Sequence, residues 1–101
     1  MRGVLMDTSN EWTELGKYIR KVRTEKGISA YSIEKNYEFS RQFWSRIELG
    51  TQKSAMKPDL LKKIASILGI NYINLYLIVG YIDKESLDEY IKETFKKEEN
   101  A

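Results

Sequence analysis

The twenty residues from Ser29 to Glu48 constrain the fold more than any other segment, because they predict two short helices with almost no room between them. Ser29 and Ser40 are each suited to an N-cap, where a side-chain oxygen accepts a hydrogen bond from a free amide of the first turn. One helix is expected to reach about Asn36 and the next about Glu48, before Gly50. The apolar residues that should turn inward are Ile33, Tyr37, Phe39, Trp44 and Ile47.

Helical periodicity recurs along the rest of the chain, and no segment alternates as a half-buried strand would. The first helix is expected to start near Asn10, or a turn earlier if Thr8 and Glu11 form a capping box. Pro58 suits the first turn of a helix and Asn71 suits a cap. The expected helices cover residues 10–27, 29–36, 40–48, 58–69, 71–79 and 84–97, which predicts an all-α fold.

The composition predicts one globular domain of ordinary character. The chain has 101 residues, of which 42% are apolar and 32% are charged. Histidine and cysteine are both absent, which removes the commonest zinc ligands, the usual general base and the thiolate nucleophile. We therefore expect a protein that is not an enzyme and that uses no metal or cofactor.

No segment predicts export or membrane insertion. The opening six residues are too few for the apolar core of a signal peptide. The longest apolar run, residues 72–82, spans eleven residues and includes Asn74. A bilayer crossing requires about 20 residues. Together with the lack of cysteine, this favours a cytoplasmic protein with no membrane partner.

The net charge of +2 conceals an uneven distribution. Between Lys17 and Lys63, twelve lysine and arginine residues stand against five acidic residues, a net charge of +7. From Asp83 onward, four basic residues stand against seven acidic ones, a net charge of −3. This distribution suits a polyanionic partner, which the basic body would bind and the acidic tail would repel. An ordinary solvated charged surface is the alternative.

The side of the 40–48 helix that faces away from the predicted core carries Arg41, Gln42 and Arg46, with Phe43 at its margin. Arginine can form two hydrogen bonds to guanine and glutamine two to adenine, in the major groove of DNA. A short helix that presents such groups after a turn favours sequence-directed DNA binding. The alternative is an ordinary helical hairpin with polar residues facing solvent.

The segments around this unit extend the pattern. LGKYIRKVRTEKGIS precedes it, and IELG, a basic loop and LLKKIASILGI follow it. This order, from Leu15 to Val79, resembles the Cro/repressor-type (XRE-like) helix-turn-helix DNA-binding domain family. The resemblance implies a compact five-helix lambda-repressor-like domain whose third helix enters the major groove. On this interpretation residues 1–9 are a flexible N-terminus, residues 10–82 the domain, and residues 83–101 a C-terminal amphipathic helix with a frayed acidic end.

The resemblance also implies roles for individual residues. Arg23 and Glu48 occupy the positions of a scaffolding ion pair between the first and third helices. Base reading falls on Arg41, Gln42, Phe43 and Arg46. Phosphate contacts fall on the N-termini of the second and third helices and on nearby lysines, namely Ser29, Ser40, Lys35, Lys53 and Lys57.

Three residues depart from the family pattern. Ala30 replaces a glutamine that braces the DNA backbone, and Glu34 replaces the small residue where the two helices touch. A carboxylate there must reach solvent or a basic neighbour, or the helices must splay. Glu38 stands where glycine usually adopts a left-handed conformation, which is unfavourable for a residue with a Cβ.

One helix reads few base pairs, so proteins of this kind generally bind two-fold operators as homodimers. The apolar residues expected at the dimer interface are Leu75, Ile78, Tyr81, Ile82, Leu87, Tyr90, Ile91 and Phe95. In the alternative arrangement, the last helix folds back and covers residues 77–82 within one chain. A regulatory protein that binds the C-terminal helix is a further expected partner.

The favoured interpretation is a cytoplasmic transcriptional regulator, a repressor of a phage or another mobile element, that binds an inverted repeat in double-stranded DNA. The alternative is a protein-interaction module on the same fold, an antitoxin or anti-repressor, whose DNA binding is secondary or lost. Ala30, Glu34, Glu38 and an exposed Phe43 favour that alternative.

Overall fold

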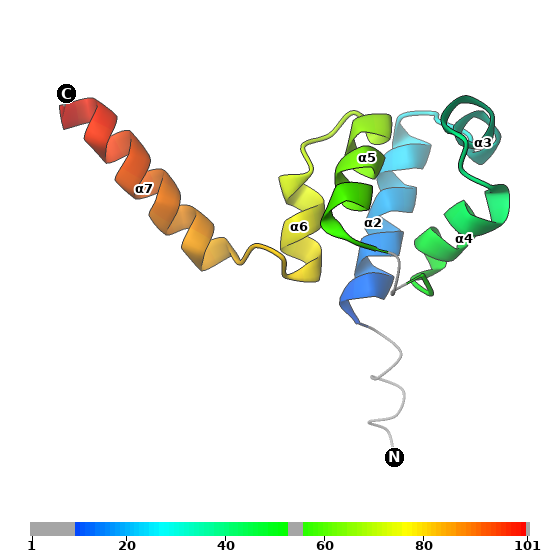
Figure 1. Cartoon of the computed structure of the whole chain (residues 1–101), viewed down its shortest axis with the longest axis horizontal. Helices are drawn as coiled ribbons and strands as arrows, with labels where there is room; N and C mark the ends of the chain where they lie inside the picture. Colours follow the sequence, from blue (N-terminus) through cyan, green and yellow to red (C-terminus); the bar gives the residue numbers. More distant parts are fainter. Residues whose placement is uncertain (1–9, 53–55, 101) are drawn as a thin grey trace, which may run out of the picture.

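The computed structural model describes residues 10–52 and 56–100, with side chains as far as Phe95 (Figure 1). Within these residues the protein has six helices and no strand, which confirms the all-α prediction. The helices are α2 (Glu11–Glu25), α3 (Ala30–Tyr37), α4 (Arg41–Leu49), α5 (Pro58–Leu68), α6 (Ile73–Val79) and α7 (Lys84–Asn100). The expected flexible N-terminus, the capping box at Thr8 and the predicted contact residue Lys53 lie outside the described residues.

The starts of the first three helices follow from their caps. The Asn10 side chain accepts hydrogen bonds from two amides of the first turn of α2, at 2.9 and 3.0 Å. Ser29 caps α3 and Ser40 caps α4, each through a bond of 3.0 Å to the third amide of its helix. Each cap satisfies amide groups that a helix leaves without partners, so the chain can turn sharply between α3 and α4.

The start of α6 differs from the prediction. Asn71 was the expected cap, but the helix begins at Ile73, and Tyr72 occupies the cap position without a side-chain bond. Asn71 Oδ1 instead accepts a hydrogen bond from the Ile73 amide at 2.8 Å. The same side-chain chemistry therefore forms a turn one residue earlier, and α6 is shorter than expected.

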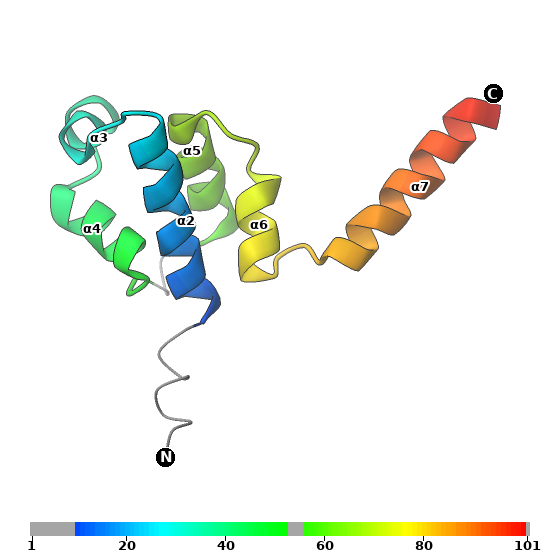
Figure 2. The ribbon, with the colours of Figure 1, turned by 180° about the vertical axis from the view of Figure 1, so that it is seen from behind.

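Helix α2 lies at the centre of the packed body. It contacts α4, α5 and α6, while α3 packs on α4 (Figures 1 and 2). Tyr37, predicted to be buried, is 43% exposed. Helix α3 ends at Tyr37, Glu38 turns the chain, and Phe39 takes the inward position. The buried core comprises Leu15, Ile19, Val22, Ile33, Phe39, Trp44, Ile47, Met56, Leu61, Ile64, Ala65, Ile67, Leu68, Leu75 and Val79.

Two features join α2 to α4. The Arg23 guanidinium donates to both carboxylate oxygens of Glu48, Nε to Oε2 at 2.5 Å and Nη2 to Oε1 at 3.1 Å. The Trp44 indole N–H donates to the same Oε2 at 2.6 Å. The expected ion pair is therefore present, and its side chains are only 14% and 11% exposed. At the second feature, Gly16 lies against the backbone of Ile47 and Glu48 with no space for a Cβ.

Helix α7 projects away from the body (Figures 1 and 2). Asp83 caps it, accepting from the Ser86 amide at 2.7 Å and the Ser86 hydroxyl at 3.0 Å. These bonds stabilise the carboxylate and lower the pKa of Asp83 below its ordinary value of 3.8.

Helix α7 does not fold back over residues 77–82, as the alternative arrangement required. None of the described helices is both long and apolar enough to cross a membrane.

The position of α6 also corrects the expected dimer surface. Leu75 is completely buried and Val79 nearly so, because both point into the core beneath α2. Leu75 therefore belongs to the core and not to a surface that a second chain could contact. Ile78 and Ile82 are half-buried and Tyr81 is 43% exposed.

The approach of α2 to α4 generates a stability prediction. Alanine in place of glycine inside a helix normally stabilises it by about 0.5–1 kcal/mol. Gly16→Ala should do the opposite and lower the free energy of unfolding by about 3 kcal/mol, because the new methyl group overlaps the α4 backbone. Urea unfolding followed by circular dichroism measures this.

Gly27→Ala is the matched control. Gly27 has φ +70 and nothing within 4 Å of an added Cβ, so only backbone strain of about 1 kcal/mol is expected. Equal losses in the two variants would contradict a tight contact between α2 and α4.

Candidate nucleic-acid interface

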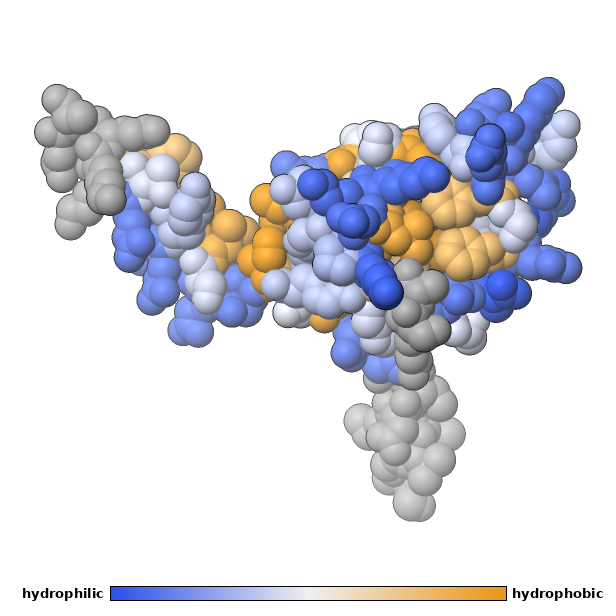
Figure 3. All heavy atoms as spheres, viewed as in Figure 1, coloured by the Kyte–Doolittle hydropathy of each residue, from blue (hydrophilic) through white to orange (hydrophobic). Residues whose placement is uncertain are grey.

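The outer side of α4 forms a continuous exposed strip. Its residues recur at intervals of one, three and four along the helix, which places them on one face. They are Arg41, Gln42, Ser45, Arg46 and Leu49. On the inner side, Trp44 and Ile47 are 1% and 2% exposed and fix the rotation of the helix about its axis. In Figure 3 the edge of the body formed by α3 and α4 is mostly hydrophilic.

Phe43 lies between the two sides of α4 and is partly buried. Its ring stacks on Phe39 with 5.8 Å between centroids and 7° between planes. Phe39 in turn meets Trp44 edge to face at 5.7 Å. The prediction of an exposed Phe43 is therefore wrong, since Phe39 at the turn covers one face of its ring. Phe43 is therefore less accessible to a ligand than predicted.

Arg41 is held by two residues of α3. Its Nη2 lies 3.3 Å from Glu34 Oε1, and its guanidinium carbon lies 5.8 Å from the centre of the Tyr31 ring. The side chains of Arg41 and Glu34 are 57% and 42% exposed, so solvent screens the ion pair strongly. Glu34 therefore reaches a basic neighbour across the two helices, one of the outcomes that the sequence allowed.

Arg46 is held from the other end of α4. Its Nε donates to Gln52 Oε1 at 2.7 Å, and Gln52 belongs to the loop that follows Gly50. Both guanidinium groups of the strip thus have partners within the chain, whereas Gln42 makes no side-chain hydrogen bond among the described residues. A nucleic acid would have to share or replace these two arginine contacts.

The residues expected to contact phosphate are only partly brought together. The hydroxyl oxygens of Ser29 and Ser40 accept the capping bonds of α3 and α4, at the ends where helix dipoles favour anions. Lys35 is exposed on α3, with its Nζ 6.0 Å from the centre of the Tyr31 ring. Lys57 is exposed at the start of α5, and no described contact joins it to the α3–α4 cluster.

The turn between α3 and α4 rests on Glu38. Its backbone has φ 62 and ψ 27, the left-handed conformation, and it is the one non-glycine residue with positive φ in the described parts of the chain. Glu38, one of the departures from the family pattern, thus adopts the left-handed backbone conformation that usually requires glycine. The residue keeps the helices in place at some cost in strain.

Four residues of the interface were missing from the predicted set: Tyr31, Ser45, Leu49 and Gln52. Ser45 could have been found, because it lies one helical turn after Arg41. Leu49 follows Ser45 by a further turn. Tyr31 and Gln52 carry no such signal, since their contacts depend on how α3 and the loop lie beside α4.

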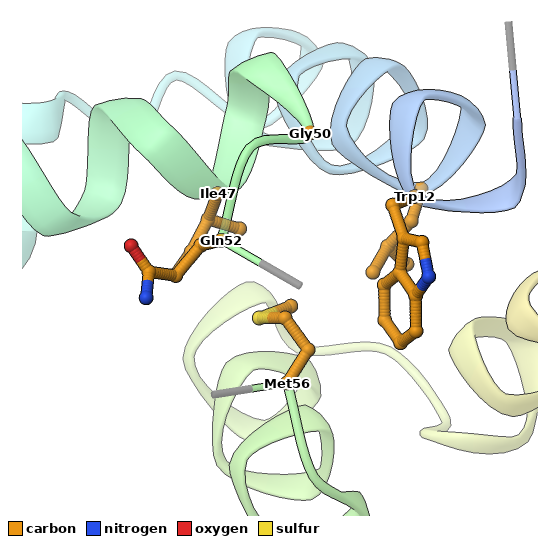
Figure 4. A pocket seen from close by; sticks show the side chains of 6 residues that line it. Trp12, Ile47, Gly50, Gln52 and Met56 are labelled. Atoms are coloured by element: carbon orange, nitrogen blue, oxygen red, sulfur yellow. The ribbon is translucent and has the colours of Figure 1, made fainter. Parts of the chain in front are cut away.

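The described residues also line a small hollow. A hollow of about 150 Å³ is lined by Trp12, Leu15, Ile47, Gly50, Gln52 and Met56, but no water-sized molecule fits in it. Figure 4 shows Met56 extending toward Ile47, with Trp12 on the other side of the hollow. The described residues contain no cluster of acidic side chains able to hold a metal ion.

Comparisons with known proteins gave no match: no protein-family model, no curated protein and no solved structure is similar to the chain.

The strain at Glu38 can be measured. Glu38→Gly should raise the free energy of unfolding by up to about 1 kcal/mol, because the relief of left-handed strain, about 1–2 kcal/mol, exceeds the entropy cost of glycine. Glu38→Ala removes the same carboxylate but keeps a Cβ, so it should give no gain. A comparable gain from alanine in urea unfolding would show that charge, rather than backbone strain, sets the cost.

Proposed function

We propose that this protein is a cytoplasmic DNA-binding transcriptional regulator, most simply a repressor, and that α3 and α4 form its helix-turn-helix. The observation that carries the proposal is the exposed strip on α4, which presents the hydrogen-bond donors of two arginines and one glutamine to solvent. The opposite side of α4 packs into the aromatic and aliphatic core. A helix of this size fits the major groove of B-DNA, where side chains can reach base edges.

The strip is suited chemically to base edges. Arg41 and Arg46 can each donate two parallel hydrogen bonds to O6 and N7 of guanine, and Gln42 can pair with N6 and N7 of adenine. The pairs with Glu34 and Gln52 hold the guanidinium groups near the strip before binding. Pre-placed side chains lose less conformational entropy when the complex forms.

The remaining charges are suited to the backbone of DNA. Residues 17–63 carry a net charge of +7, which attracts a polyanion regardless of its sequence. The N-termini of α3 and α4 leave free amides that can bind phosphate oxygens, and Lys35 in the last turn of α3 adds a positive charge. Such contacts fix the position of α4 in the groove, while the strip supplies the discrimination.

We propose further that two copies bind an inverted repeat. A single α4 presents only a few base-reading side chains, too few to single out one site in a genome. Two helices related by a two-fold axis read two half-sites of a pseudo-palindromic operator. Control through a regulatory protein at the C-terminal helix is compatible with this arrangement.

A second candidate function is a protein-interaction module on the same fold, an antitoxin or anti-repressor. The ion pair between Glu34 and Arg41 favours it, because it places a carboxylate beside a proposed base-reading residue. A gel-shift assay against the promoter region of the protein's own gene, beside a pull-down with the purified chain, separates the two functions. Recovery of one protein without any DNA shift would favour the second.

The base-reading role of α4 is tested by two variants on DNA sites selected from random sequence. Arg41→Ala should reduce discrimination at one base pair of each half-site by about 1–3 kcal/mol. Lys35→Ala should weaken binding to all sequences alike and lower the slope of log affinity against log salt by about 1. An unchanged base preference in Arg41→Ala would remove α4 from the groove.

The role of Glu34 is tested with a charge-matched control. Glu34→Gln should raise affinity for all DNA sequences, since one negative charge is lost, but should relax the preference at the base that Arg41 reads, since the side chain is released. Glu38→Gln removes an equal charge from a residue that makes no bond to Arg41. It should raise affinity without changing the preference, and an identical effect of both variants would contradict the positioning role.

A further inference from the structure

Helix α7 has an apolar stripe along which no other helix of the described residues packs. Leu87, Ile91 and Phe95 recur every four residues, with Tyr90 beside them. Leu87 is half-buried, whereas Tyr90 is 63% exposed, Ile91 39% and Phe95 54%. No helix of the body packs along α7, and Figure 3 shows hydrophobic patches among hydrophilic residues on this arm. A stripe of this kind on a projecting helix indicates an interface.

The body itself is closed at the base of the arm. The Tyr81 hydroxyl donates to the Met56 carbonyl at 2.7 Å, and its ring lies 6.3 Å from Trp12 and 5.8 Å from Tyr76, edge to face. These contacts occupy Tyr81 within its own chain. Of the expected dimer surface, the part that remains unpartnered is the α7 stripe.

We propose that α7 pairs with α7 of a second copy of this chain, antiparallel, about a two-fold axis that passes beside Ile91. The spacing supports this occupant. Leu87 and Phe95 lie four residues on either side of Ile91, so the axis sets Ile91 against Ile91 and Leu87 against Phe95 of the second copy. The stripe is thus complementary to itself, as a two-fold interface requires.

The charges beside the stripe favour the same arrangement. Asp88 and Lys92 each follow a stripe residue and lie on one flank, one turn apart, yet neither forms an ion pair with any residue whose side chain the structure describes. In an antiparallel two-fold pair, the same flank of each helix lies beside that of the other, and the two run in opposite directions. Each Asp88 therefore lies near Lys92 of the other chain. A parallel pair would set Asp88 beside the opposite flank, at the level of Ser86 and Tyr90.

The inference rests on the proposed function, in which a dimer binds an inverted repeat. The pairing of α7 can nevertheless be tested without DNA. The chain has no cysteine, so single-cysteine variants of the full chain report one position each. Under mild oxidation, Ile91→Cys should form a disulfide-linked dimer within minutes. Leu87→Cys and Phe95→Cys should each form no disulfide alone but should cross-link when mixed. Glu89→Cys, on the far side of α7, is the control and should not cross-link.

Sedimentation equilibrium provides the second measurement. The native chain should sediment as a dimer, and Ile91→Asp should weaken the association at least about tenfold with unchanged helix content. Self-linking of Leu87→Cys and Phe95→Cys would overturn the proposal in favour of a parallel pair. A native dimer in which no α7 cysteine cross-links, or a native monomer, would also overturn it. A dimer with the expected cross-links that selects no DNA sequence would instead count against the proposed function alone.

Discussion

The carboxylate of Glu48 determines how α4 is presented. It accepts hydrogen bonds from Arg23 on α2 and from Trp44 on α4 itself, in a site that is nearly closed to solvent. The bidentate geometry sets the angle between the two helices, and the indole bond sets the rotation of α4. Replacement of such a group by an apolar residue can be neutral for stability, whereas loss of one partner leaves a costly charge. Its contribution is therefore best understood as orientation rather than as net stability.

The close approach at Gly16 complements this ion pair. Electrostatic contacts alone tolerate shifts of a few tenths of an ångström, but backbone in contact with backbone does not. Helix α4 is thus fixed in distance at one point and in angle at another. The exposed strip inherits this precision because Trp44 and Ile47, its opposite side, belong to the same core.

Much of this fold follows from local sequence signals. The caps at Asn10, Ser29 and Ser40 and the pairing of Arg23 with Glu48 were predicted, because each depends on near neighbours or on a known helix arrangement. The errors arose where tertiary packing decides. Phe39, which follows the turn, is buried in place of Tyr37, and its ring also stacks on Phe43. Leu75, expected at a dimer interface, lies in the core. The contact between Glu34 and Arg41 needed the crossing of two helices, which no periodicity describes.

Among the residues that the structure describes, helix α7 contributes none to the core of the body, and no helix of the body packs along the apolar stripe of α7. Substitutions in the stripe should therefore have little effect on the stability of the body. If α7 pairs as proposed, exchange of the arm for a helix with a different stripe should alter which chains associate while leaving the folding of the body intact. The two parts are therefore free to diverge separately, so that paralogues with a common recognition surface could avoid mixed assemblies.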